Sequence, residues 1–457
     1  MKRSFLFAMF VGAAGCSTEA LELEAPAAND APSFELADAT PTLDVPAHPP
    51  VGAPPVGTPI EPPVAPVDVP PVVAVGLGRR HSCAVTKLGE LFCWGSGARG
   101  QTGHGDEETI GDDELPAQRS RVDLGHHFVI DVAAGHHHTC ALTGAGEVLC
   151  FGVGAYGQLG LASTDDVGAT SAPDTVTAIG GSAAQIVAGE LHTCVLLDDG
   201  HVRCFGAGDD GRLGYGDAQH VGDDEAPHVR DFVDLGLNVV ALAAGDAHTC
   251  ALSVEGTVRC WGENDDGRLG YGMVGDIGDD ESPKDAGLVP LPGLAVQISA
   301  GTSHTCAVLE DGGVACFGKN RYGELGTDSA ETIGDDAHDT IVRVDLDLPV
   351  AEVSAGNFRT CVRFETGGVR CWGYPFDGGL GVGSMTYAPS PRAAEDVGLG
   401  MDAFSIASGG DHSCAIVEGR HLRCWGQGEG GRLGYGSEDN VGDDELPMVM
   451  GDVALFD

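Results

Sequence analysis

The chain has 457 residues, of which 24 are Lys or Arg and 69 are Asp or Glu, so its formal net charge is −45. A charge of this sign and size repels phosphate backbones and anionic headgroups, so we expect no nucleic-acid binding and no direct binding to a membrane surface. Glycine is abundant, with 71 residues, and aromatic residues make up only 6% of the chain, which is typical of many turns between short strands.

The first 15 residues resemble a secretion signal. Two basic residues precede the apolar run 4–11, which is too short to span a bilayer as a stable anchor. Small residues then lead to Cys16, as in a bacterial lipobox, although Ala13 stands where that pattern usually has leucine. We predict that residues 1–15 are a lipoprotein signal peptide and that Cys16 is lipidated. The alternative is an ordinary signal peptide with a coincidental cysteine. Ser17 after the cysteine favours the outer membrane or cell surface over other sites in the envelope.

Residues 16–71 are rich in proline and alanine and contain few large apolar residues. Paired prolines favour the extended polyproline conformation. We therefore expect a semi-rigid tether, which holds the rest of the chain at a membrane only through the lipid on Cys16.

The other 14 cysteines form the strongest pattern in the chain. They fall into seven pairs whose members are ten positions apart, and the first members recur every 53 to 57 residues. A fixed period of this size indicates a propeller or a solenoid. The pairs are Cys83 and Cys93, Cys140 and Cys150, Cys194 and Cys204, Cys250 and Cys260, Cys306 and Cys316, Cys361 and Cys371, and Cys414 and Cys424.

One repeat, read from residue 129, shows the expected elements. Strand candidates at 129–134, 139–142 and 147–151 are separated by a loop and by the glycine-containing turn 143–146. No stretch after residue 72 carries a sustained helical period. Short strands with regular turn signals predict an all-β domain over 72–457.

A hairpin around that turn places the two cysteines of a repeat opposite each other. Opposed Cα atoms in antiparallel strands lie ~4.5 or ~5.5 Å apart, and disulfides accept ~4.4–6.8 Å. We therefore predict seven disulfides, which an exported chain would form in an oxidising compartment. Metal binding by 14 thiolates is the alternative, but the close cysteine pairs of zinc sites are absent from the sequence. In each repeat an aromatic residue directly follows the second cysteine, and we interpret it as a residue that packs inside the blade. These residues are Trp94, Phe151, Phe205, Trp261, Phe317, Trp372 and Trp425.

These motifs resemble the repeat of the regulator of chromosome condensation family. The pattern stands at 245–252 (GDAHTCAL), 256–262 (GTVRCWG) and 267–270 (GRLG), and matches recur in all seven repeats. The resemblance implies a seven-bladed β-propeller of repeats about 55 residues long. Arg359 replaces a histidine in repeat six, and Thr102 replaces a leucine in repeat one. The best-known member is a nuclear exchange factor that binds chromatin. Neither role is expected here, because we predict that the chain is exported and because it is strongly acidic.

Positions that are alike in every repeat serve the fold, and a unique site should lie where repeats differ. The recurrent histidines are therefore interpreted as structural: His81, His138, His192, His248, His304 and His412. The two residues before each of these positions, and before Arg359 in repeat six, vary completely. Propeller symmetry places these loops in one ring, which we predict to bind a partner. The alternative is neutral drift. The candidate partner-binding residues are Arg79, Arg80, His136, His137, Glu190, Asp246, Asn357, Phe358 and Asp411.

Five of the seven long loops contain the sequence Ile/Val-Gly-Asp-Asp, and repeats two and six lack it. Clustered carboxylates can bind calcium, but the spacing matches no EF-hand loop, and Asp and Gly are ordinary turn residues. The two deviating loops are candidates for specific contacts. We predict no cofactor and no metal.

The sequence predicts a monomeric, non-enzymatic scaffold that binds protein or glycan at the bacterial envelope. One alternative is a propeller that inhibits a secreted enzyme. Another is an enzyme that cleaves polysaccharide or peptide. A lone acid with a strongly raised pKa in a central pocket would indicate the enzyme. An aromatic-rich, shallow face would indicate a binder or inhibitor.

Overall fold

The structure of the protein, a computed structural model, describes residues 70–456. The predicted signal peptide, Cys16 and nearly all of the predicted tether lie outside this range. Within it, no helix has the length and hydropathy needed to cross a membrane.

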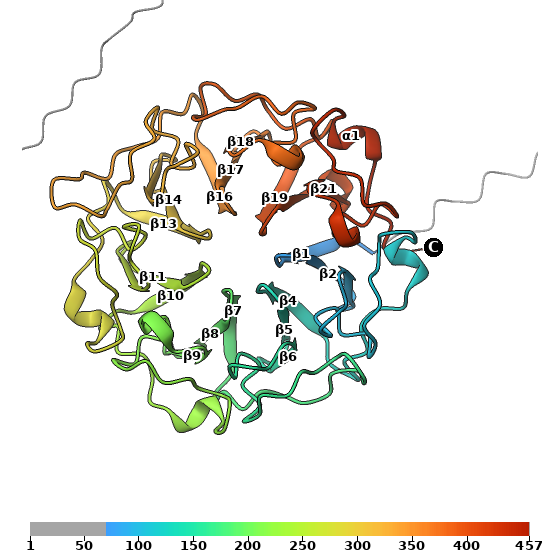
Figure 1. Cartoon of the computed structure of the whole chain (residues 1–457), viewed down its shortest axis with the longest axis horizontal. Coiled ribbons are helices and arrows are strands. Elements are labelled where there is room, and N and C mark those ends of the chain that lie inside the picture. The colour runs from blue at the N-terminus through green and yellow to red at the C-terminus, as the bar shows by residue number, and fades with distance from the viewer. Residues whose placement is uncertain (1–69, 457) are drawn as a thin grey trace, which may run out of the picture. The chain divides into compact units, whose positions relative to one another are not determined.

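Seven three-stranded antiparallel sheets surround a central axis, each made of strands consecutive in the chain (Figure 1). This confirms the predicted seven-bladed, all-β propeller. The blades are β1 (Val72–Leu77), β2 (His81–Thr86), β3 (Leu91–Gly95); β4 (Val129–Ala134), β5 (His138–Thr143), β6 (Val148–Gly152); β7 (Ala183–Ala188), β8 (His192–Leu197), β9 (Val202–Gly206); β10 (Val239–Ala244), β11 (His248–Ser253), β12 (Val258–Gly262); β13 (Ala295–Ala300), β14 (His304–Leu309), β15 (Val314–Gly318); β16 (Val350–Ala355), β17 (Arg359–Phe364), β18 (Val369–Gly373); and β19 (Ala403–Ser408), β20 (His412–Val417), β21 (Leu422–Gly426).

Helical structure in the described range is limited to single turns, which lie between strands or after the last strand. These are η1 (Pro116–Gln118), η2 (Asp209–Gly211), η3 (Pro227–Val229), η4 (Pro283–Ala286), η5 (Phe376–Gly378), η6 (Glu418–Arg420), η7 (Glu429–Gly431) and α1 (Pro447–Met450).

The first strand of each blade lies nearest the central axis, and the second and third lie progressively further out (Figure 1). The second strand is buried along its whole length in six blades, because sheets of neighbouring blades cover both of its faces. In the blade read from the sequence, the observed strands β4, β5 and β6 match the predicted strands to within one residue at each end.

Each blade carries one disulfide across the hairpin of its second and third strands, in the seven predicted pairs. Their Cα atoms lie 4.0 to 4.1 Å apart. In the first blade the amide of Thr86 donates to the carbonyl of Glu90. Counting back along the register places Cys83 opposite Cys93 at a non-hydrogen-bonded position, where strands approach most closely.

The blades are joined by a ring of buried hydrogen bonds, which we call the histidine belt. In each of six blades, Nε2 of the histidine that opens the second strand bonds a hydroxyl of the next blade. The distances are 2.7 to 2.9 Å. The bond between His412 and Ser82 closes the ring between the last blade and the first. In blade six Arg359 Nε donates to Ser413 Oγ at 3.2 Å. These contacts agree with the structural interpretation of the six histidines.

Other repeated residues also join blades. The aromatic residue after the second cysteine is buried in every blade, and Trp94 Nε1 donates to the carbonyl of Arg432 in blade seven at 2.9 Å. In the Ile/Val-Gly-Asp-Asp loops, the glycine has a positive φ and faces the neighbouring blade. A Cβ on Gly111 would lie 2.5 Å from the carbonyl oxygen of Gly431, and one on Gly222 would lie 2.4 Å from that of Gly157. The recurrence of this glycine therefore follows from blade packing.

Candidate functional site

One end of the propeller carries the loops that differ between blades. His81 opens β2 opposite Gly95, which closes β3. The loop between the first two strands and the loop after the third strand therefore emerge at the same end of every blade. We call this end the loop face. The tight turns between the second and third strands lie at the opposite end.

The predicted ring of variable residues surrounds a cavity at the centre of the loop face. Residues of all seven blades line it, including four of the candidates: Arg79, His136, Asp246 and Asn357. The other five candidates are not among the lining residues, although Glu190 contacts the lining residue His136, and the structure does not bring all nine together. Arg80 Nη2 lies 3.6 Å from Glu429 of blade seven, and Asn357 donates to Asp411 at 3.0 Å.

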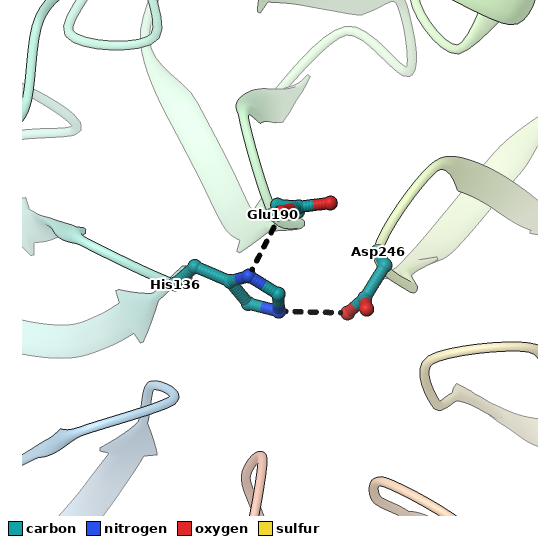
Figure 2. Close-up of side chains that lie close together, drawn as sticks. All are labelled: His136, Glu190 and Asp246. Carbon is teal, nitrogen blue, oxygen red and sulfur yellow. Dashed lines mark hydrogen bonds and ion pairs between the residues drawn. The ribbon is translucent and has the colours of Figure 1, made fainter.

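Three candidates meet at this cavity in what we call the ion triad (Figure 2). His136 of blade two lies between Glu190 of blade three and Asp246 of blade four. Its Nδ1 is 3.2 Å from a Glu190 oxygen and its Nε2 is 3.0 Å from an Asp246 oxygen. Burial lowers the pKa of His136, but hydrogen bonds to Asp246 and Glu190 outweigh this and raise it to about 9. The hydrogen bond from His136 lowers the pKa of Glu190.

The ion triad has the residue types of a metal site, with ligand atoms within 4.8 Å of one another. Its hydrogen bonds favour another arrangement, because both imidazole nitrogens face carboxylates and the ring is held as a cation. A protonated imidazole has no free lone pair for a metal. We therefore assign the ion triad to fixing the loops of three successive blades, which no sequence spacing indicated.

Around the ion triad the loop face divides into sectors of different chemistry. Blades one and two supply cationic and imidazole groups from Arg79, Arg80, Arg99 and His137, and burial together with the charge on His136 lowers the pKa of His137. Blades three and four supply an acidic sector, in which Glu263 lies 2.7 Å from the buried Arg268. Burial raises the pKa of Glu263, and the charges of Asp210 and Asp265 raise it further.

Blades five and six supply a cluster of aromatic rings, which we call the aromatic cluster: Tyr322, Phe358, Tyr374 and Phe376. Tyr374 is central, with its ring centroid 4.8 Å from that of Tyr322, 6.1 Å from that of Phe358 and 4.7 Å from that of Phe376. Phe376 is 52% exposed. Of these four rings, Phe358 was predicted from the sequence and the other three were missed. Tyr374 and Phe376 lie in the deviating loop of repeat six, which could have indicated them, whereas Tyr322 lies in the loop of repeat five.

The acidic segments of the long loops recur as equivalent groups in four blades: Asp112 to Glu114, Asp223 to Glu225, Asp279 to Glu281 and Asp443 to Glu445. In each group, burial and then a hydrogen bond and charge from the neighbouring aspartates raise the pKa of the glutamate to about 7. A feature repeated in four blades belongs to the blade architecture and does not single out one site.

Comparisons with known proteins agree with this architecture. An RCC1-like domain model matches residues 111–454, and a regulator of chromosome condensation (RCC1) repeat model matches residues 72–101. The ultraviolet-B receptor UVR8 of Arabidopsis thaliana is 30% identical over 382 residues, which cover 81% of this chain and 80% of UVR8. The human E3 ubiquitin-protein ligase HERC2 is 34% identical over 267 residues, or 57% of this chain and only 5% of HERC2.

Among solved structures, Prp20p from Saccharomyces cerevisiae is similar with a TM-score of 0.65 and 21% identity, covering 84% of this chain and 86% of Prp20p. Prp20p has been characterised for its binding to Gsp1p and histones. At this identity, the likeness shows the fold.

Proposed function

The chain belongs to the RCC1-like family of β-propellers, and from this premise we propose that it is a non-catalytic scaffold that binds a protein partner through the loop face. Relatives support this proposal: UVR8 is a receptor, and Prp20p has protein-binding properties. The observation that carries the proposal is the contrast between the interior of the repeats and their loop-face residues. Their cores and inter-blade contacts match, while equivalent positions on the loop face differ in charge and aromatic character.

The proposal extends to where the scaffold acts. A lipid on Cys16 anchors the mature chain at the cell envelope, and the tether of residues 16–71 gives the monomeric propeller reach. The signal-like sequence before Cys16 supports this placement. The seven disulfides also support it, because disulfides persist in oxidising compartments.

The arrangement of carboxylates favours a binding role. A catalytic acid at the central cavity would need a raised pKa, whereas the pKa of Glu190 is lowered. Glu263, whose pKa is raised, is paired with the buried Arg268 at 2.7 Å. Glutamates whose pKa is raised to about 7 lie in four equivalent loops. The aromatic cluster is the kind of shallow, aromatic-rich surface that protein partners use.

Site-specific photocrosslinking in the producing cells tests the binding face. A photoreactive residue is placed at Arg79 or Phe376 on the loop face. Matched controls carry it at Leu88 or Val254, which are 58% and 62% exposed in turns at the opposite end. We expect a discrete protein adduct from the loop-face positions and none from the controls. Adducts that form equally at both ends, or only at the turns, would contradict the proposal.

The lipid anchor is tested separately with Cys16→Ser. We expect the lipid mass on the mature chain to disappear and the protein to leave the membrane fraction, with all seven disulfides intact. An unlipidated wild-type chain that stays soluble after export would contradict the anchor and leave the binding face unaffected.

A further inference from the structure

We propose that the aromatic cluster on blades five and six binds a cationic segment of the partner, with lysine or arginine side chains lying over its exposed rings. This inference rests on the proposed function and specifies the chemistry of the partner.

The aromatic cluster is not part of the repeating fold. At the position of Tyr374, the other blades carry Ser96, Val153, Ala207, Glu263, Lys319 and Gln427. At the position of Phe376, they carry Ala98, Ala155, Asp209, Asp265, Arg321 and Glu429. Six blades fold without an aromatic ring at either position, so packing of the blade does not require these rings.

The backbone of Phe358 shows that the cluster is held at an energetic cost. Its φ is +57°, in the left-handed region that bulky residues rarely adopt. None of the six equivalent residues before the second strand has a positive φ. Strain of this kind costs on the order of 1–3 kcal/mol and clusters at functional sites. Here it brings the Phe358 ring to 5.3 Å from Tyr322, measured between centroids.

The rings pack against one another and leave no cage. Their centroids are 4.7 to 6.1 Å apart, with interplanar angles of 50° to 66°. A cation therefore does not fit between them and must lie on the outer ring faces. One such contact already exists within the chain, because the Arg321 guanidinium lies 5.4 Å from the centroid of Tyr322.

The charges beside the aromatic cluster favour a cation. Among residues 70–456, Asp377 accepts from the neutral side-chain amides of Gln427 and Asn440, at 3.3 and 3.4 Å, and forms no ion pair. Asp411 accepts from Asn357 and lies 3.9 Å from the buried Arg432. Carboxylates next to aromatic faces attract lysine and arginine through both ion pairing and the ring quadrupole. An apolar segment would instead desolvate these carboxylates without replacing their hydrogen bonds.

Binding of synthetic peptides tests this inference. The probe is a peptide of alternating lysine and serine, compared at physiological salt with peptides in which glutamine or glutamate replaces lysine, and with neutral oligosaccharides. The variants are Phe376→Leu, which keeps apolar area but removes the ring, and Asp377→Asn, which removes the charge. Asp377 has a φ of +56°, and asparagine tolerates this conformation. The matched control is Asp265→Asn in the acidic sector, which removes one charge from the same face.

We expect the lysine peptide to bind the wild type and to lose about tenfold in affinity in Phe376→Leu and in Asp377→Asn. Asp265→Asn should retain the wild-type affinity. Equal losses in Asp265→Asn and Asp377→Asn would show diffuse attraction and overturn the inference. So would a preference for the glutamine peptide or for oligosaccharide. If loop-face crosslinks to the natural partner persist while these peptides fail, only this inference falls. If those crosslinks are also absent, the proposed function falls with it.

Discussion

His136 and His138 stand two residues apart in blade two, yet the structure moves their pKa values in opposite directions. Burial lowers the pKa of His138 to about 3, and no carboxylate counteracts it, since its Nε2 meets the hydroxyl of Thr193 at 2.9 Å. At His136, hydrogen bonds to two carboxylates outweigh burial and raise the pKa to about 9. The same side chain is therefore neutral where it joins two blades in the interior and a cation where it lines the central cavity.

This difference indicates that the histidine belt and the ion triad have separate roles. The histidine belt joins six blades to the next through neutral histidines, and blade six uses the guanidinium of Arg359 instead. The ion triad occurs once and orients loops that differ between blades. Stability should therefore depend on the belt, and the shape of the loop face on the triad. The following predictions test that division, from the largest expected effect to the smallest.

Acid should destabilise the belt most strongly. The pKa values of His81 and His138 are about 3 and that of His304 is about 4, below the value of about 6.5 in the unfolded chain. Between these values the unfolded chain binds protons that the folded protein does not. Stability is therefore full above pH 6.5 and falls as the pH decreases toward 3. At pH 5 each of the three histidines should remove about 2 kcal/mol.

Denaturant unfolding with intact disulfides at pH 7 and pH 5 measures this loss. The acidic-loop glutamates oppose it, but they are solvent-screened, so their effect is smaller. His304→Gln isolates one histidine. The stability difference between wild type and variant should shrink by about 2 kcal/mol from pH 7 to pH 5. A constant difference would mean that His304 titrates normally.

Removing one histidine of the histidine belt should lower the free energy of unfolding by nearly as much. In His192→Ala, the bond from Nε2 to Thr249, 2.9 Å long, is lost and a buried cavity remains. We expect the free energy of unfolding to fall by about 2–4 kcal/mol. His137→Ala is the matched control, because His137 is only half-buried and lies outside the belt. Its effect should stay within about 0.5 kcal/mol, and equal effects of the two changes would refute the special role of the belt.

High pH should destabilise the protein through the ion triad, whereas low pH destabilises it through the histidine belt. Because the pKa of His136 in the folded protein is about 9, above the unfolded value, the stabilisation is full below pH 6.5 and is lost as the pH rises through 9. After allowance for solvent screening we expect a loss of about 1–2 kcal/mol. Nuclear magnetic resonance titration of the His136 ring measures the pKa directly. His136→Gln should abolish this alkaline dependence, and an imidazole that titrates near 6.5 would contradict the triad.

Restoring histidine in blade six should have the smallest effect. The buried Arg359 has one guanidinium nitrogen without a hydrogen-bond partner, and burial lowers its pKa to about 10. In Arg359→His the new imidazole can bond the hydroxyl of Ser413 and complete the histidine belt. The free energy of unfolding at pH 7, measured by thermal denaturation, should therefore rise by about 1 kcal/mol or less. A clear loss of stability would show that the guanidinium supports blade six in its own right.

The strongest sequence predictions concern contacts that are local in the chain. Cysteines ten residues apart flank one glycine turn, so a single hairpin brings them together whatever the rest of the fold does. The strands of a blade follow one another for the same reason, and the repeat period then gives the ring of seven. The belt could also have been read from the sequence, because a Ser or Thr stands before the first cysteine in every repeat.

Only the tertiary structure decided what the loop face contains. His136 and Asp246 are 110 residues apart and meet because the curvature of the ring brings both side chains to the central cavity. Tyr322 and Tyr374 come from different blades and share one patch for the same reason. Side-chain direction and distance across blades are not encoded in repeat spacing. The sequence alone therefore determined the blades and their disulfides, and the packing of blades around a common axis determined the site.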